Sequence, residues 1–290
     1  MIRALALAAA LAALLPAGAS SSASPIPGFT PSRYQGHGGT VWTGTIPGAL
    51  APPHPGPSYV YLPPNYSPAQ HYPVVYLLHG LPGDPRIYVD GSHLAQVADR
   101  LIADGAEPFI AVAPYAGPPT HRGLAEWAGR WEDYLVDEVV PWADASLPTI
   151  QSAGGRVLAG LSAGGFGAVD IGLRHPQLFG TLESWSGYFT PLDDGPFVHA
   201  PRAYLAAHDP TQLVLQETAR LRRFDTRFEL STGAAHGRVA PWMTTAFAAE
   251  LHTLRLPVSL WIVPSVRQGP SYGLQMARGL SYAFARAARP

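Results

Sequence analysis

Short runs of apolar residues alternate along the chain with segments in which apolar residues recur at helical spacing. The continuous apolar run at 72–78 is typical of a strand that is buried on both faces, and the run at 109–113 predicts the next one. The spacing of Trp131, Leu135, Val139 and Trp142 predicts a helix that reaches Pro141 or slightly beyond. The other strands expected are 58–66 (ending in a turn), 157–159, 181–186, 227–232 and 258–263. The other helices expected are 94–103, 243–254, 274–287 and the segment that follows Ser162. In that last helix, Phe166, Val169 and Leu173 are expected to face inward.

This order of elements predicts an α/β fold. Strands that alternate with helices pair in parallel, so we expect a mostly parallel central sheet with helices on both faces. We find no internal repeat and no linker, which predicts one domain at 58–290. Residues 187–212 are rich in proline and predict an irregular excursion from this domain.

The first 57 residues differ from the rest. Arg3, an apolar run at 4–15 and small residues at 17–19 predict a cleavable signal peptide of bacterial type at 1–19 and a secreted mature protein that begins near Ser20. The apolar run is short for a bilayer span, so we do not expect membrane anchoring. Residues 20–57 are rich in Pro, Gly and Ser, which predicts a loosely packed lead-in with one short strand near 40–45.

The composition of the chain excludes several classes of partner and of chemical site. The net charge of −1 and the lack of a long charge run favour neither nucleic acid nor an anionic membrane as a partner. The chain has no cysteine, which excludes disulfides, thiolate metal sites and a cysteine nucleophile. No histidine and acid spacing resembles a metal site, and no glycine-rich loop is placed to cradle phosphate, so we expect neither a metal nor a cofactor.

The segment 160–164 fits the pattern G-x-S-x-G, with a strand before it and a helix after it. In this pattern the serine, here Ser162, lies on a sharp strand-to-helix turn that raises its hydroxyl above the sheet. Side chains in place of Gly160 and Gly164 would collide with the neighbouring strand and helix. The free backbone N–H groups at the helix N-terminus can also stabilise negative charge beside the serine.

Five stretches together make the chain similar to the esterase branch of the α/β-hydrolase fold, which includes esterase D-like enzymes and secreted mycolyltransferases. They are 61–66 (YLPPNY), 72–80 (YPVVYLLHG), 160–168 (GLSAGGFGA), 175–179 (HPQLF) and 183–188 (ESWSGY). The resemblance covers 58–286. It implies transfer of an acyl group from a small-molecule or lipid ester by a Ser-His-Asp/Glu triad, with Ser162 as nucleophile and the backbone N–H groups of Leu81 and Ala163 as oxyanion hole.

The chain departs from the family where the partners of the serine are expected. The acid position after the strand 227–232 holds His236, and the base position after the last strand holds Arg267. Arginine stays protonated and cannot accept a proton from serine. Two hypotheses follow. In a rewired hydrolase, His236 acts as the base for Ser162, although a plain loop histidine is the alternative. In a catalytically inactive homologue, the chain keeps the serine turn as architecture and serves as a binding or scaffold protein.

The remaining histidines are weaker candidates. His199 and His208 lie in the excursion over the site and could supply a base, while Asp209 is expected to start the turn into Pro210. His79 belongs to the His-Gly loop and is expected to be structural or to line the pocket. His175 is expected to cap the helix that follows Ser162, and His252 is expected at the surface.

A further segment is expected near the rim of the pocket. It contains Glu126, Trp127, Arg130 and Trp131, and the two tryptophans are expected to have packing roles.

Overall fold

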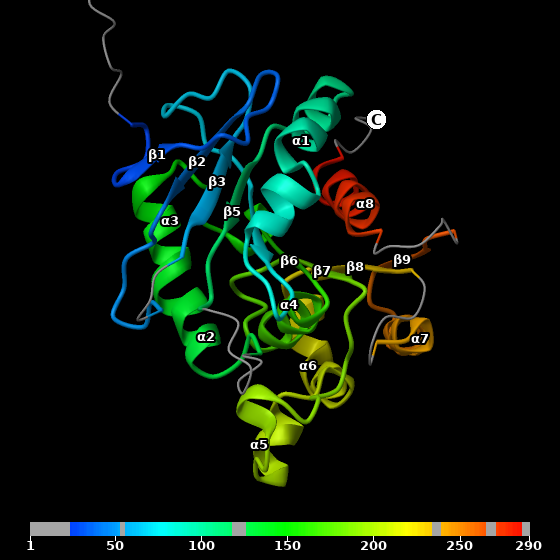
Figure 1. Cartoon of the computed structure of the whole chain (residues 1–290). Helices are drawn as coiled ribbons and strands as arrows, with labels where there is room; N and C mark the ends of the chain where they lie inside the picture. The colour runs from blue at the N-terminus through cyan, green and yellow to red at the C-terminus, as the bar shows by residue number, and fades with distance from the viewer. Residues whose placement is uncertain (1–23, 53–55, 118–125, 234–238, 265–270, 286–290) are drawn as a thin grey trace, which may run out of the picture.

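The computed structural model describes residues 24–52, 56–117, 126–233, 239–264 and 271–285. In this part of the chain the strands form one sheet in the order β1-β2-β3-β5-β4-β6-β7-β8-β9 (Figure 1). The strands are β1 (Phe29–Pro31), β2 (Thr40–Gly44), β3 (Ser58–Leu62), β4 (Val74–Leu78), β5 (Ile110–Ala113), β6 (Arg156–Leu161), β7 (Thr181–Trp185), β8 (Arg227–Thr232) and β9 (Val258–Ile262).

The six strands from β5 to β9 in this order pair in parallel, whereas β1, β2 and β3 add antiparallel pairings at one edge. The register places Leu78 beside Gly160, and Leu161 beside Trp185. The carboxyl ends of the central strands therefore reach the same edge of the sheet. Crevices outside this edge are where open α/β sheets bind ligands.

The helices are α1 (Leu94–Ala103), α2 (Arg130–Asp133), α3 (Val140–Ser146), α4 (Ala163–Arg174), α5 (Arg202–Ala207), α6 (Pro210–Arg223), α7 (Pro241–Thr253) and α8 (Tyr272–Phe284). Two apolar cores lie on opposite faces of the sheet. One contains residues of α3, α4, α6 and α7, and the other contains residues of α1 and α8, which lie side by side in Figure 1. The α/β architecture that the alternating pattern predicts, a mostly parallel sheet with helices on both faces, is confirmed.

Several predicted elements match the structure closely. The helix predicted at 94–103 and the strand predicted at 227–232 have the bounds that the sequence pattern gave, and β4 and β5 are buried along their whole length. Helix α4 is more buried than a one-faced pattern requires, because every residue from Ala163 to Leu173 is buried. It lies between the sheet and other helices, which explains its mostly small and apolar sequence.

The prediction of a loose lead-in is wrong for the described part of 20–57. Strands β1 and β2 extend the sheet, and Ile26, Phe29, Val41 and Ile46 are almost fully buried. The strand expected near 40–45 is confirmed as β2. Strand β1 was not expected, because it has only three residues and is stabilised by its pairing with β2 rather than by its own pattern.

The helix predicted to stop near Pro141 continues to Ser146. A wide helical turn over Tyr134–Val139 joins α2 to α3, and the proline lies in the first turn of α3. Proline is tolerated in the first turn because its missing N–H needs no partner there. The end of the pattern at Trp142 therefore underestimates the length of the helix.

The excursion at 187–212 is less irregular than its prolines suggest. It contains a short 3-10 turn at Gly195–Phe197 and helix α5, and its end belongs to α6, which the sequence reading missed. Asp209 was expected to start a turn, but its side chain accepts a hydrogen bond from the N–H of Thr211, 3.0 Å away, and caps α6. An aspartate followed by Pro210 is a helix-start signal.

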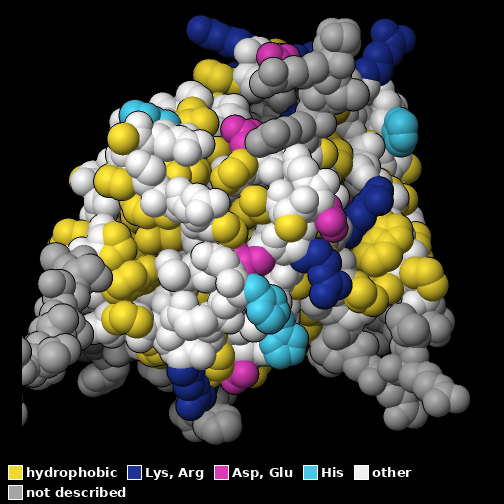
Figure 2. Space-filling view, turned by 90° about the horizontal axis from the view of Figure 1, so that it is seen from above, with side chains coloured by type: hydrophobic (Ala, Val, Ile, Leu, Met, Phe, Trp, Pro, Cys, Tyr) yellow, Lys and Arg dark blue, Asp and Glu magenta, His cyan; other side chains and the backbone are white. Residues whose placement is uncertain are grey.

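Among the described residues, no helix is both long enough and apolar enough to cross a membrane. Figure 2 shows one face of the molecule, on which basic side chains lie singly or in small groups between apolar and uncharged ones. The described residues therefore show no continuous basic stripe on this face. The signal peptide predicted at 1–19 lies outside the described residues.

Candidate active site

Ser162 lies on the turn that connects β6 to α4. Its backbone has φ 54° and ψ −119°, a conformation that is strained for a residue with a side chain. The turn is held by two hydrogen bonds: the Ser162 N–H donates to the oxygen of Trp185, and its carbonyl accepts from the N–H of Phe166, both at 3.0 Å. The Ser162 hydroxyl does not cap α4 and so is not used to hold the helix.

Two glycines allow this turn to form. A Cβ at 164 would overlap the carbonyl oxygen of Leu78 on β4, and a Cβ at 160 would overlap the carbonyl of Gly164. The collisions predicted from the sequence are confirmed. Because the obstructing atoms belong to the backbone, no side-chain movement could relieve them.

The half-buried Ser162 lines a pocket of about 360 Å³ at the carboxyl edge of the sheet. The pocket wall is mostly apolar and comes from three parts of the chain: the loop after β4, the end of β6 and the start of α8. Its lining residues are Gly80, Leu81, Pro82, Gly83, Ile87, Leu161, Ser162 and Tyr272. Pockets of this size and character accommodate small organic ligands.

The loop 79–83 lies beside Ser162, and a Cβ on Gly80 would approach the Ser162 Cβ to 3.3 Å. This places Leu81, the predicted oxyanion-hole residue, in the wall of the same pocket. Ala163, the second predicted donor, follows Ser162 at the first position of α4 and is buried. Assignment of their N–H groups to an oxyanion hole stays a prediction.

His79 is structural and is not a base for Ser162. Its ring is fully buried, with Nδ1 3.0 Å from the oxygen of Gly80 and Nε2 3.3 Å from the N–H of Ala116. A carbonyl accepts and an N–H donates, so the imidazole is neutral with its proton on Nδ1. Burial lowers the pKa of His79 to about 4, which agrees with this neutral form. The ring thus ties the loop after β4 to the end of β5.

Among the described residues, the other candidate histidines do not line the Ser162 pocket. His175 is the C-cap residue of α4, as expected, and its Nε2 lies 2.9 Å from a carboxylate oxygen of Glu132. His252 and His199 are exposed. His208 is buried, and its Nδ1 donates to Asp170 at 2.8 Å. Asp170 is two turns of helix beyond Ser162, so His208 is held about 12 Å further along α4.

His236 and Arg267, the residues at the predicted acid and base positions, lie outside the described residues. Their described neighbours lie at the carboxyl edge of the sheet. Val239 packs in an apolar cluster with Ala163 and Phe166, and Tyr272 lines the Ser162 pocket. The predicted roles of His236 and Arg267 therefore stay predictions.

The tryptophans and Glu126 near the rim behave largely as expected. Trp127 is fully buried, and its Nε1 donates to the oxygen of His79 at 2.9 Å, so it supports the loop after β4. Glu126 is buried and accepts a hydrogen bond from the hydroxyl of Tyr188. The guanidinium of Arg130 lies over the ring of Trp131 and donates to backbone carbonyls around Leu50. None of these residues lines the Ser162 pocket itself, and of these contacts the one that reaches its wall is the hydrogen bond from Trp127 to the loop after β4.

A model of the family described as "Putative esterase" matches residues 52–254, more than half of the chain. The chain belongs to this esterase family. It is 34% identical over 137 residues to an endo-1,4-beta-xylanase/feruloyl esterase of Xylanibacter ruminicola, and 32% identical over 136 residues to an esterase of Mycobacterium tuberculosis. These matches take in 44% of this chain but only 19% and 28% of the two relatives.

Solved structures share the fold of this esterase-family chain. A ferulic acid esterase superposes with a TM-score of 0.73 at 21% identity, covering 85% of this chain and 98% of that one. The S-formylglutathione hydrolase of Staphylococcus aureus superposes with a TM-score of 0.67 at 17% identity, covering 84% and 98%. The expected resemblance to the α/β-hydrolase esterases is confirmed.

Sequence reasoning missed two features of this esterase-family chain. Tyr272 lines the Ser162 pocket, although the closing helix was expected to begin only at Leu274. Burial raises the pKa of Tyr272, so its hydroxyl is a hydrogen-bond donor at neutral pH. The Asp170–His208 pair was also missed, and its one signal was an aspartate within the otherwise apolar sequence of α4. Among the described residues, no group of three or more potential metal ligands occurs.

Proposed function

We propose that this protein is a secreted serine esterase that hydrolyses a carboxylic ester, or transfers its acyl group to another acceptor, through Ser162. The observation that carries the proposal is the strained backbone of Ser162, which holds an uncommitted hydroxyl in a mostly apolar pocket. Strain at a residue in a pocket is typical of functional sites. Membership of the esterase family supports the same reaction class.

In the proposed reaction a base removes the proton of the Ser162 hydroxyl while its oxygen attacks the ester carbonyl carbon. The carbonyl oxygen becomes an oxyanion, for which the N–H groups of Leu81 and Ala163 are the proposed donors. The bond to the alcohol then breaks, and the alcohol leaves with the proton. Water, or an acceptor alcohol, releases the acyl group from Ser162 by the reverse sequence.

We propose His236 as the base. The described lining of the Ser162 pocket contains no histidine and no carboxylate, so the described residues offer no other base in contact with the serine. His236 lies between Gly233, at the end of β8, and Val239, which packs with Ala163. This position in the chain, three residues after Gly233 and three before Val239, supports the assignment.

The proposal is tested by labelling the protein with a fluorophosphonate, which reacts with an activated serine and hardly with an ordinary one. We expect labelling of the wild type and none of Ser162→Ala or His236→Ala. His252→Ala, which removes an exposed histidine of α7, is the matched control and should label normally. Labelling that needs Ser162 but not His236 would contradict the dyad and direct the search to His199. N-terminal sequencing of the exported protein tests cleavage near Ser20.

A second candidate function is that of a catalytically inactive homologue that binds its ligand in the Ser162 pocket. The observation in its favour is the arginine at position 267, where the family resemblance implies a base. A folded sample that neither labels nor hydrolyses p-nitrophenyl esters above the Ser162→Ala background would support this candidate and refute the esterase proposal.

A further inference from the structure

A second pocket, larger than that of Ser162, lies at the opposite end of the sheet. Its volume is about 690 Å³. Its wall is formed by the segments that precede β6, β7 and β8, so it lies at the amino ends of these strands. Its lining residues are Ser152, Ala153, Gly154, Gln177, Gly180, Thr181, Arg223, Phe224, Asp225 and Arg227. A strand of six residues separates it from Ser162 by about 20 Å, too far for one small substrate to span.

The floor of this pocket is fixed by backbone contacts. The Gly180 N–H donates to the oxygen of Ala153 at 2.8 Å, and a Cβ at position 180 would lie 2.6 Å from that same oxygen. A Cβ at Gly154, by contrast, would meet nothing within 4 Å. The turn that carries Gly154 therefore faces open space and leaves room for a ligand.

The pocket presents a surplus of hydrogen-bond donors, drawn from different segments. The guanidinium groups of Arg223 and Arg227 form no ion pair with any described residue, unlike that of the neighbouring Arg220, which pairs with Glu217. Arg220 also donates to Oε1 of Gln177 at 2.9 Å, which leaves the amide nitrogen of Gln177 as the free end.

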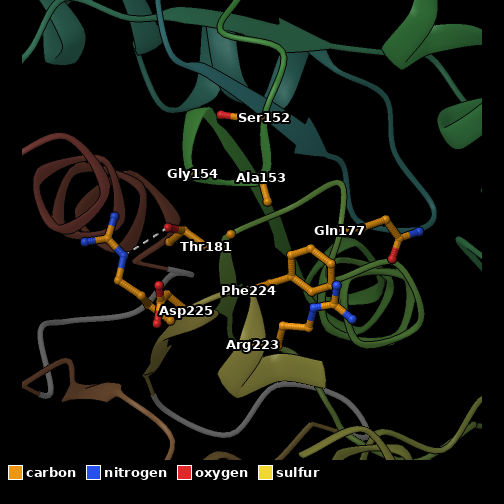
Figure 3. Close-up of a pocket in the computed structure, with 10 residues that line it drawn as sticks. Ser152, Ala153, Gly154, Gln177, Thr181, Arg223, Phe224 and Asp225 are labelled. Atoms are coloured by element: carbon orange, nitrogen blue, oxygen red, sulfur yellow. Dashed lines mark hydrogen bonds between the residues drawn. The ribbon is translucent and has the colours of Figure 1, made fainter. Parts of the chain in front are cut away.

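Arg227 is oriented by Thr181 and by an aromatic ring. Its Nε donates to the hydroxyl oxygen of the buried Thr181 at 3.3 Å, the dashed line in Figure 3, and its guanidinium lies over the ring of Tyr282. No described residue accepts a hydrogen bond from the terminal nitrogens of Arg227, which form a fork. Such a fork recognises a carboxylate or phosphate through two parallel hydrogen bonds.

Two further features suit a sugar ring. Figure 3 shows Phe224 and Gln177 on one side of the pocket and Asp225 on the other. The half-buried Phe224 offers an apolar surface, and the exposed Asp225 offers a carboxylate that accepts hydrogen bonds from hydroxyl groups. Asp225 has φ 51°, so the turn holds this carboxylate at the pocket in a left-handed conformation that aspartate tolerates.

We propose that this pocket binds an anionic sugar unit, a sugar ring that carries a carboxylate or a phosphate. Arg227 holds the anionic group on the side of Asp225. Arg223, Gln177 and Asp225 hold the hydroxyls, and Phe224 packs against the ring. The site is separate from Ser162, so it adds a binding function that does not depend on ester chemistry. It would allow the protein to stay attached to a charged saccharide while the Ser162 pocket remains free.

The test is calorimetric titration of the full mature protein with glucuronic acid, glucose 6-phosphate and glucose. We expect the two anionic sugars, or one of them, to bind at least tenfold more tightly than glucose, because hydrogen bonds to charged groups are the stronger ones. Preference for the uronic acid would assign a carboxylate, and preference for the phosphate ester a phosphate. Equal binding of glucose, or no binding of any sugar up to about 10 mM, would overturn the proposal.

Variants locate the binding. Arg227→Gln and Arg223→Gln should each weaken binding about tenfold, and Gly154→Glu, which places an acid in open space at the pocket, should abolish it. Arg100→Gln, an exposed arginine of α1, and Ser162→Ala should bind like the wild type. Binding that survives Gly154→Glu would refute this site. Because Ser162→Ala keeps the sugar site, failure of the esterase proposal and failure of this one are distinguishable.

Discussion

Helices α4 and α8 cover opposite faces of the same central strands, yet they bury acidic side chains in opposite ways. On the α4 face, Asp170 is fully buried and accepts hydrogen bonds from His208 and Arg174. On the α8 face, Glu183 and Glu229 lie directly opposite each other on β7 and β8, and both are fully buried. Within the described residues, neither glutamate forms an ion pair at close range.

The two faces differ in what offsets the cost of burying a carboxylate charge. Burial raises the pKa of Asp170, but the hydrogen bond from His208 and the charge of Arg174 act against that rise. For Glu183, burial and the neighbouring charge of Glu229 both raise the pKa. Burial raises the pKa of Glu229 to about 8, with Arg278 opposing it. The α4 face thus holds a charged network, whereas the α8 face holds a pair of carboxyls that retains a proton at neutral pH.

The two helices also approach the sheet differently. At its N-terminus α4 meets the backbone of β4 through Gly164, and a Cβ there would strike a carbonyl oxygen. In the middle of α8, Gly279 lies against the side chains of Glu183 and Trp185. Backbone cannot move aside, whereas side chains can. The α4 contact is therefore the more rigid of the two.

The largest effect is expected at this rigid contact. Gly164→Ala places a methyl group into the carbonyl oxygen of Leu78. Overpacking usually lowers the free energy of unfolding by roughly 1–3 kcal/mol, and a clash with backbone should lower it by more. We therefore expect no soluble, folded protein to be recovered. Gly154→Ala, whose methyl group meets nothing within 4 Å, is the control and should express normally. Circular dichroism and yield measure the outcome. A folded Gly164→Ala protein would refute the close approach.

The next effect concerns the charged network of the α4 face. Asp170→Ala should lower the free energy of unfolding by about 3 kcal/mol, because it leaves the buried His208 without its acceptor and removes one of the two carboxylates that Arg174 contacts. Urea unfolding of Asp170→Ala, His208→Ala and the double variant gives the coupling energy. Additive single effects would show that the 2.8 Å contact between His208 and Asp170 contributes no pairwise stability.

The glutamate pair predicts a dependence of stability on pH. A carboxyl whose pKa is higher in the folded state than in the unfolded state binds an extra proton on folding, so stability is greatest below the unfolded pKa, near ~4.3, and falls as the pH rises toward 8. Glu229→Gln should reduce this slope and stabilise the protein at pH 8 relative to wild type, while the buried Glu183 retains the rest of the slope. Glu217→Gln, outside the pair, should retain the slope. Thermal melts at pH 5 and pH 8 measure this change in stability. An unchanged slope in Glu229→Gln would contradict the inference that the glutamate pair retains a proton at neutral pH.

The smallest effect is expected beside His208. Asp209→Ala removes the cap of α6 and should cost about 1 kcal/mol, in the range of other N-cap losses. The loss should be similar at pH 5 and pH 8, since Asp209 is not part of either buried acid group. Urea unfolding measures it. A loss as large as that of Asp170→Ala would mean that Asp209 supports the network and not only its own helix.

The sequence predicted the local parts of the candidate site well. Gly160, Ser162 and Gly164 lie within one turn, so the pattern of five consecutive residues predicts the turn, although the backbone of β4 also crowds its glycines. The structural role of His79 was likewise among the readings of the His-Gly loop. Helix α6 was missed because most of its residues are polar, although Asp209 and Pro210 marked its start.

What the sequence determined by itself is the alternation of strands and helices, the glycine-framed serine turn and the absence of cysteine chemistry. These follow from neighbours along the chain. Only the tertiary structure decided that Asp170 meets His208, that Glu183 faces Glu229, that Tyr272 reaches the serine pocket and that Arg223 and Arg227 line one pocket. The first three of these contacts join segments far apart in sequence, and strand register and helix packing set such contacts.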